Sequence, residues 1–231
     1  MNKKLVFIWC FALFGCGPKN LDLKNIPLGQ KSAVQLSDYT QNTKEQKGRF
    51  EKPTENGIDL VDKGEKITYY FFAGKDNITF NKARLANVLE SKVVTYDGIV
   101  SFIGIHPDNR DAVNLLKSII TENGTPDSII YDERKFTSVD KATLPVLQDA
   151  MGDKIKEVTD EFDDKSTRYP QRLIWTKNDI LTEVIIDPTN AHLNMAVNII
   201  TKKAYADHIV IEYFKPLLKE YDSPYLHLFK K

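Results

Sequence analysis

Short apolar runs separated by turn residues follow one another from residue 67 onward. Residues 67–72 (Ile-Thr-Tyr-Tyr-Phe-Phe) are β-branched or aromatic and precede a Gly-Lys-Asp-Asn turn. Residues 92–95 and 99–105 flank Asp97-Gly98, a pair that tolerates the positive φ angles of a tight hairpin turn. We therefore predict a strand over 67–72 and a β-hairpin over 92–105. Residues 78–80 could return antiparallel to the first strand, and residues 82–90 fit either a helix or a strand.

A helix is predicted over residues 109–122. After Pro107, Asp108 and Asn109 offer capping side chains, while Asn123-Gly124 and Pro126 end the pattern. One stripe of the segment is apolar and would face a core; it consists of Ala112, Leu115, Leu116, Ile119 and Ile120. A short strand over 128–131 should follow.

The second half of the chain predicts more strands after a charged insertion. Residues 132–168 show weak helical patterning and predict two short helices separated near Gly152. Strands are then expected over 172–175 and 180–186, in a hairpin closed by Pro188. A last pair of strands is expected over 195–201 and 208–214.

Residues 17–64 are polar, with scattered apolar positions and no sustained period. Such a composition buries little apolar area, so we predict a flexible tether with a short strand near 58–61. Runs of strands separated from helices then indicate an α+β fold, a mostly antiparallel β-sheet packed by helices on one face. A doubly wound parallel sheet is the weaker alternative. We expect one domain over 64–231 after a tether over 16–63.

The first sixteen residues have the layout of an export signal. Lys3 and Lys4 precede ten apolar residues from Leu5 to Phe14, and Gly15 stands directly before Cys16. This segment resembles the lipobox signal peptide of bacterial lipoproteins. The resemblance implies that residues 1–15 are removed and that Cys16 becomes the lipidated first residue. It also implies a cell-envelope location, and Gly17 after the cysteine suggests the outer membrane, on either face.

Other readings of this segment remain open. The apolar run is about half the roughly 20 residues that a membrane-spanning helix needs, so a permanent span is disfavoured. Phe14 is bulky for its place before a lipobox cysteine, which leaves ordinary secretion as an alternative, and a buried N-terminal element is another. If the anchor forms, several acyl chains would hold the protein on the membrane firmly.

Composition narrows the classes of partner. Cys10 and Cys16 are the only cysteines, so a mature chain with an acylated Cys16 can form no internal disulfide. Removal of residues 1–15 leaves 30 basic and 32 acidic residues, a formal net charge of −2. Nucleic acid is therefore not an expected partner.

The common catalytic and ligand motifs are absent: no P-loop, dinucleotide-binding glycine pattern, nucleophile elbow or zinc-protease motif is present. We therefore predict no cofactor and no metal site. His106, His192, His208 and His227 lack the close spacing of a structural zinc site. His106 or His192 could act as a base, although a loop histidine without a catalytic role is the more common case.

Two further groups of residues are candidate sites. The acids Asp160, Glu161, Asp163 and Asp164 could hold calcium but lack an EF-hand pattern, which favours a solvated helix end. Aromatic residues gather near both ends of the domain and favour a sheet covered on both faces over an exposed binding platform; they are Tyr69, Tyr70, Phe71, Phe72, Tyr213, Phe214, Tyr221, Tyr225 and Phe229. Trp175 is expected in the core.

The sequence therefore favours an envelope lipoprotein that is anchored to the membrane through Cys16 and binds or assembles with an envelope protein. Catalysis is not favoured, and no catalytic residue is assigned. Two alternatives stay open. One is a hydrolase that acts on envelope glycans or peptides through two carboxylates, one with a raised pKa. The other is a protective inhibitor or immunity lipoprotein that uses the insertion at 132–168.

Overall fold

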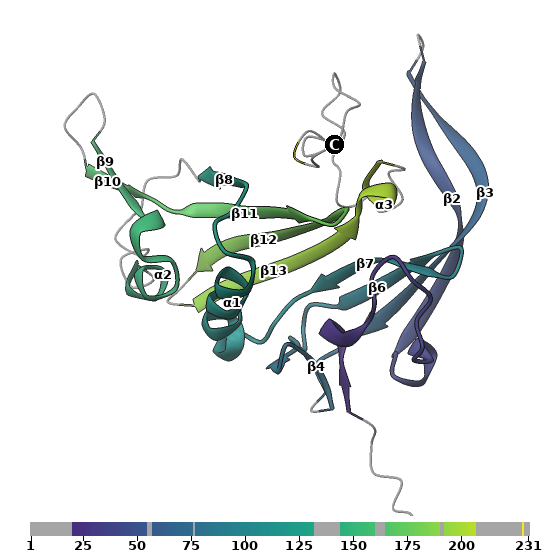
Figure 1. Cartoon of the computed structure of the whole chain (residues 1–231), viewed down its shortest axis with the longest axis horizontal. Helices are drawn as coiled ribbons and strands as arrows, with labels where there is room; N and C mark the ends of the chain where they lie inside the picture. Colours follow the sequence, from purple (N-terminus) through teal and green to yellow (C-terminus); the bar gives the residue numbers. More distant parts are fainter. Residues whose placement is uncertain are drawn as a thin grey trace, which may run out of the picture.

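The computed structural model describes residues 20–54, 57–75, 77–131, 144–159, 165–189, 192–206 and 228. Its centre is an open eight-stranded antiparallel sheet, and the fold is α+β, as predicted (Figure 1). The strands lie in the order β2-β3-β6-β7-β13-β12-β11-β8. Their bounds are β2 Asn42–Thr54, β3 Gly57–Phe72, β6 Ser91–Tyr96, β7 Ile99–Ile105, β8 Ser128–Tyr131, β11 Pro170–Lys177, β12 Ile180–Thr189 and β13 His192–Thr201.

The hairpin of β6 and β7 confirms the prediction for residues 92–105. Asp97 has φ 51° and Gly98 has φ 76°, the left-handed conformation that the Asp-Gly pair tolerates in a tight turn. The strand predicted over 67–72 is the last part of β3 and pairs with β6 from Ile67 to Phe72. Residues 78–80 form β4 (Ile78–Phe80), which does not return along β3. It pairs with β1 (Leu21–Asp22) and with β5 (Ala83–Arg84) in a small separate sheet.

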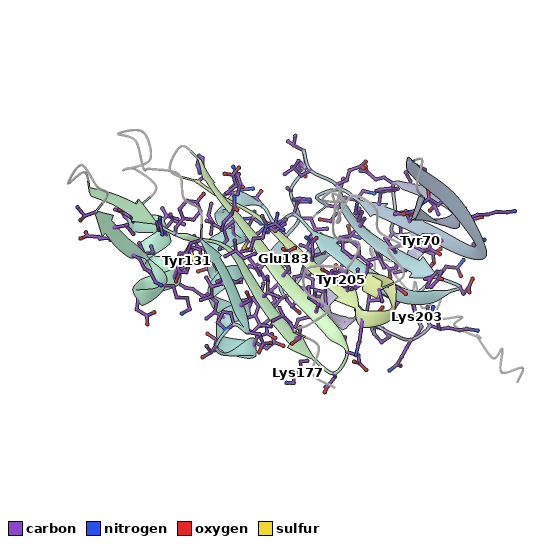
Figure 2. All side chains as sticks on the ribbon, turned by 90° about the horizontal axis from the view of Figure 1, so that it is seen from above. Tyr70, Tyr131, Lys177, Glu183, Lys203 and Tyr205 are labelled. Atoms are coloured by element: carbon purple, nitrogen blue, oxygen red, sulfur yellow. The ribbon has the colours of Figure 1, made fainter. Side chains whose placement is uncertain are left out.

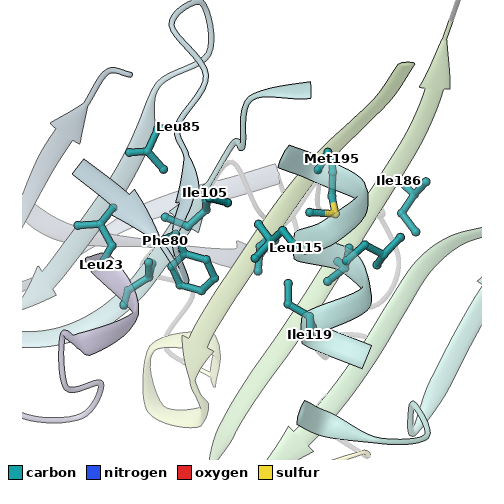
Figure 3. Packing of buried hydrophobic residues seen from close by; sticks show 14 of the residues in the cluster. Leu23, Phe80, Leu85, Ile105, Leu115, Ile119, Ile186 and Met195 are labelled. Atoms are coloured by element: carbon teal, nitrogen blue, oxygen red, sulfur yellow. The ribbon is translucent and has the colours of Figure 1, made fainter. Parts of the chain in front are cut away.

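Two helices cover one face of the large sheet (Figure 1). Helix α1 (Asn109–Asn123) confirms the predicted helix: the Asp108 side chain accepts a hydrogen bond from the backbone N–H of Arg110, and Gly124 ends the helix at φ 75°. Helix α2 (Leu144–Met151) packs beside it. Apolar residues of both helices join one core with the inner residues of the sheet, part of which Figure 3 shows from close by.

The N-terminal segment corrects the prediction of a flexible tether. Leu21, Leu23, Ile26 and Leu36 are all buried and belong to the same core as α1. Residues Leu23–Asn25 and Leu36–Asp38 form single 3₁₀ turns, the first capped by the side chain of Asp22. Figure 3 shows Leu23 close to Phe80 of β4. From Asn20 onward, the described chain therefore belongs to the folded domain.

The opposite face of the large sheet carries a second, smaller core. It includes Phe102 of β7, Leu181 of β12 and Ile200 of β13, together with Ala204 and Tyr205 of helix α3 (Lys202–Ala206). Helix α3 packs on this face, so the expectation of helices on one face alone is corrected. The reason is local, because α3 follows β13 directly and folds back over it.

The charged insertion is part helix and part strand. Helix α2 matches the first of the two predicted helices, and a 3₁₀ turn at Gly152–Lys154 ends it. The second predicted helix is wrong over its described part: β9 (Lys156–Thr159) pairs antiparallel with β10 (Lys165–Arg168). The hairpin of β11 and β12 is confirmed, but β12 continues through Pro188 to Thr189. Residues 208–214 lie outside the described residues.

Candidate functional site

Strands β2 and β3 extend far beyond the rest of the large sheet. Strand β3 pairs with β6 only from Ile67 to Phe72, whereas it pairs with β2 along nearly its whole length. Among the described residues, residues 57–62 of β3 therefore pair with β2 alone. Together with residues 63–65 of β3 and residues 48–54 of β2 they form what we call the arm. At about 3.3 Å per residue, residues 48–54 of β2 make the arm roughly 23 Å long. Figure 1 shows it rising away from the body of the domain.

The arm begins at an irregularity in the strand pairing. Lys47 pairs with Lys66, but the next pair is Arg49 with Asp62, so three residues of β3 stand against Gly48 alone. Gly64 is one of those three, so each strand has a glycine at this joint. Irregularities of this kind bend a strand and increase its twist. The joint accounts for the different directions of the arm and the sheet.

Contacts below the joint hold the base of the arm in place. The backbone N–H of Lys66 donates to the Asp97 carboxylate (2.9 Å), and the backbone N–H of Asp97 donates to the Lys66 carbonyl oxygen (2.8 Å). The Gln46 amide donates to the Tyr69 hydroxyl (2.8 Å). The Lys66 contacts attach the base of the arm to the β6–β7 turn. The Gln46 contact joins β2 to β3 just below the arm.

Beyond the joint, the register places opposite charges across from each other. Arg49 pairs with Asp62 and Lys52 pairs with Asp59, an arrangement that favours this register over its neighbours. A two-stranded ribbon is nevertheless marginally stable alone in water, because it has no third strand or helix on which to bury a face. The opposite charges thus support the register of a ribbon that pairs with no third strand among the described residues.

Strand β2 is also the edge of the large sheet. Among the described residues, no strand pairs with its outer side. Such an edge offers a row of backbone N–H and C=O groups to which an extended peptide can add as a further strand. Three lysines and Pro53 interrupt β2, the kind of sequence that limits unspecific strand pairing. The arm and this edge form the candidate site.

A buried carboxylate on the second face of the sheet was the other candidate (Figure 2). Glu183 of β12 has no exposed surface, and it accepts a hydrogen bond from Arg172 (2.9 Å) and a longer one from Asn198 (3.4 Å). All three residues belong to adjacent strands of the sheet interior. The Glu183 carboxylate is fully buried and is hydrogen-bonded to the partly exposed Arg172. This arrangement favours a structural role for Glu183.

The acids at the start of α1 do not fit the hydrolase alternative. Asp108 and Asp111 lie near each other, but each is paired with an arginine: Asp108 with Arg110 and Asp111 with Arg84. These hydrogen bonds lower the pKa of both carboxyls. A glycosidase acid needs the opposite shift. The two acids are therefore a surface ion network that fastens β5 to the helix.

This network makes a testable contribution to stability. The substitution Asp111→Asn is expected to lower the free energy of unfolding at pH 7 by about 1 kcal/mol, because the paired carboxylate is lost. A lowered pKa in the folded state stabilises the fold above the unfolded carboxyl pKa, about 3.9, and this stabilisation is lost as pH falls. The gap between wild type and variant should therefore close below about pH 4 in urea titrations.

Asp149→Asn is the matched control for this prediction. Asp149 pairs with Lys117 at 2.7 Å, but both side chains are well exposed, so its loss should change stability by less than about 0.5 kcal/mol. An Asp111→Asn effect as small as the control's would show that the Arg84 pair does not stabilise the fold.

The histidines considered as bases lie apart from each other. His106 is half-buried after β7; its backbone N–H donates to Ser91, and its pKa is lowered by burial and by Lys92. His192 is exposed at the start of β13. His208 and His227 are outside the described residues. Within the described ranges, no group of three or more His, Cys, Asp or Glu side chains is placed to hold a metal ion.

The aromatic residues of β3 pack on both faces of the sheet, as the sequence favoured. Phe72 is buried in the main core with Tyr70 packed against it, while Tyr69 packs against the second core and stacks on Phe71 at a centroid distance of 6.1 Å. Trp175 is in the core, and its indole N–H donates to the Gly124 carbonyl oxygen (3.0 Å).

Cys16, the acids at 160–164 and the aromatic residues between 213 and 225, with Phe229, lie outside the described residues. Of the helices in the described part, none is long and apolar enough to cross a membrane. Comparisons of the chain with protein-family models, curated proteins and solved structures found no match.

Proposed function

We propose that this protein is a lipid-anchored protein of the bacterial cell envelope, attached through Cys16, that binds an envelope protein through the arm. The observation that carries the binding role is the one-sided pairing of the arm: among the described residues, β3 residues 57–62 pair only with an edge strand. The anchor is supported by the lipobox-like sequence that ends at Cys16. No cofactor or nucleic acid is part of the proposal.

The anchor and the arm would lie at opposite ends of the domain. The backbone N–H of Leu21 donates to the Asn77 carbonyl oxygen (2.8 Å), so the chain enters the domain near the turn that follows β3. The arm is at the other end of β3, beyond roughly 50 Å of strand. Figure 1 shows β1 and the arm at opposite ends of the molecule.

The distance between anchor and domain is short. Three residues separate Cys16 from Asn20, so the chain between these two residues spans at most about 14 Å. With no long tether, the domain would rest against the membrane and the arm would point away from it. Recognition by strand addition at the β2 edge fits an extended segment of the partner protein.

A shortened variant tests the binding role. Residues 48–65 are replaced by Asn-Gly, which joins the paired residues Lys47 and Lys66 through a two-residue hairpin turn. The shortened protein is expected to keep its thermal unfolding midpoint, because the core residues that the structure describes belong to other segments. In envelope preparations it should lose the partner that the full-length protein recovers. A photo-crosslinking amino acid at Thr54 should capture that partner, and one at Lys177, an exposed position elsewhere, should not.

Two outcomes would contradict the proposal in different ways. Recovery of the same partner by the shortened protein would show that the arm is not the binding site. A Cys16→Ala variant that still floats with the membrane fraction would show that lipid on this cysteine is not the anchor. The two parts of the proposal are thus tested separately.

A further inference from the structure

The loop between β5 and β6 carries two adjacent apolar side chains in solvent. Val88 is 92% exposed and Leu89 is 51% exposed, and they are neighbours in the chain. Asn87 and Glu90 on either side are exposed as well. Single exposed apolar residues are common on protein surfaces, whereas an adjacent pair at the tip of a loop needs an explanation.

This tip stands on a rigid base. Leu85 and Ser91, which flank the loop, are both buried. The backbone N–H of Ala86 donates to the His106 carbonyl oxygen (2.7 Å), and the Ala86 carbonyl oxygen accepts from the backbone N–H of Gly74 (3.1 Å). A Cβ at position 74 would collide with Asn87 and with the Leu85 carbonyl oxygen, so the two loops touch closely. The tip therefore projects from a fixed place.

The tip with Val88 and Leu89 lies at the end of the domain where the described chain begins. Strand β1 is parallel to β4 and begins level with it, with Leu21 opposite Ile78. Strand β5 runs antiparallel to β4, so the chain after β5 returns to this same end. The chain after β3 contacts both neighbours: the Asn77 carbonyl oxygen accepts from the backbone N–H of Leu21, and the backbone N–H of Gly74 donates to the Ala86 carbonyl oxygen.

We propose that Val88 and Leu89 insert into the headgroup region of the bilayer that holds the acyl chains of Cys16. The inference rests on the proposed anchor, since the chain between Cys16 and Asn20 spans at most about 14 Å. A lipid attachment that near keeps the end of the domain that carries the tip within reach of the membrane surface. Apolar side chains at an interface bury themselves about 5–10 Å deep.

The second contact would fix the orientation of the domain. A lipid anchor alone permits the domain to pivot, whereas an anchor and an inserted tip together hold it in one pose. The arm, at the far end of β3, would then point away from the membrane. Because the first attachment is already made, the tip binds at a high effective concentration and needs little affinity of its own.

The test uses lipidated full-length protein in vesicles of phosphatidylethanolamine and phosphatidylglycerol. An environment-sensitive fluorophore is attached to Val88→Cys, and in a control protein to Ile130→Cys, an exposed apolar position on strand β8. We expect a blue shift of the Val88→Cys label on reconstitution and quenching by nitroxide-labelled lipids. The Ile130→Cys label should show neither. Adding Leu89→Ser should reduce the quenching at position 88.

Flotation of the vesicles separates this inference from the anchor. If the protein floats with the vesicles but the label at position 88 stays unchanged, the tip is not inserted and the anchor stands. If the protein does not float, the anchor and the inference that rests on it both fail. A blue shift that depends on protein concentration without vesicles would assign the tip to a contact between two copies and overturn the membrane contact.

Discussion

Replacing Leu23 by alanine is expected to lower the free energy of unfolding by about 3 kcal/mol, within the usual range of 2 to 5 for a buried leucine. Leu23 has no exposed surface and packs in the main core close to Phe80 (Figure 3). Alanine would leave a cavity that the surrounding core, including β4, cannot fill completely. Urea unfolding of the unlipidated chain from residue 17 measures this directly.

Leu89→Ala is the matched control for this substitution. It removes the same atoms from a side chain that is half exposed, so its effect should stay within about 0.5 kcal/mol. Equal effects of the two substitutions would mean that residues 20–26 behave as a tether in solution and that the core ends elsewhere.

The elements that the sequence predicted correctly are determined by residues close together in the chain. The turn at Asp97-Gly98 needs only the local tolerance of these two residues for positive φ. Helix α1 needs only its apolar stripe, the Asp108 cap and Gly124. In both cases a short stretch of chain contains the whole physical cause of the structure.

The N-terminal segment could not be predicted because its cause is distant. Leu21 is buried through its pairing with Ile78, 57 residues further on, and the apolar positions around it follow no local period. A sparse pattern of this kind looks the same in a tether and in a segment that wraps a core. Residues 156–159 were mispredicted for the same reason. The spacing of Ile155 and Val158 fits a helix, but pairing with the more distant β10 makes this segment a strand.

The candidate site was missed for a related reason. Residues 48–54 are mostly polar, and only their pairing with residues 57–62 makes them a strand. The sequence did contain one signal, the short strand predicted near 58–61, which is part of β3. Strand β3 extends ten residues, 57–66, beyond its pairing with β6, and this difference is a property of the whole sheet. The exposure of Val88 and Leu89 likewise emerges only once their neighbours are placed.

Replacing Arg172 by methionine is expected to lower the free energy of unfolding by about 3 kcal/mol, the lower end of the range for breaking a buried ion pair. The guanidinium donates to the carboxylate of Glu183, which has no exposed surface. Methionine keeps much of the side-chain volume but supplies neither charge nor hydrogen bond. The lower end of this range applies because the Arg172 side chain is 38% exposed. Water can therefore reach the position that the guanidinium occupied. Urea unfolding at neutral pH measures the loss.

A double-mutant cycle with Glu183→Gln separates the charge from the packing. In the glutamine background no buried charge remains, so Arg172→Met should cost much less than in the wild type. The amide of the glutamine can still accept from Asn198, which keeps the geometry of this face. If Arg172→Met costs the same in both backgrounds, the arginine stabilises the sheet through packing alone. A large coupling would instead establish that Arg172 is required because the sheet buries an ionised carboxylate, which also assigns Glu183 to the fold rather than to catalysis.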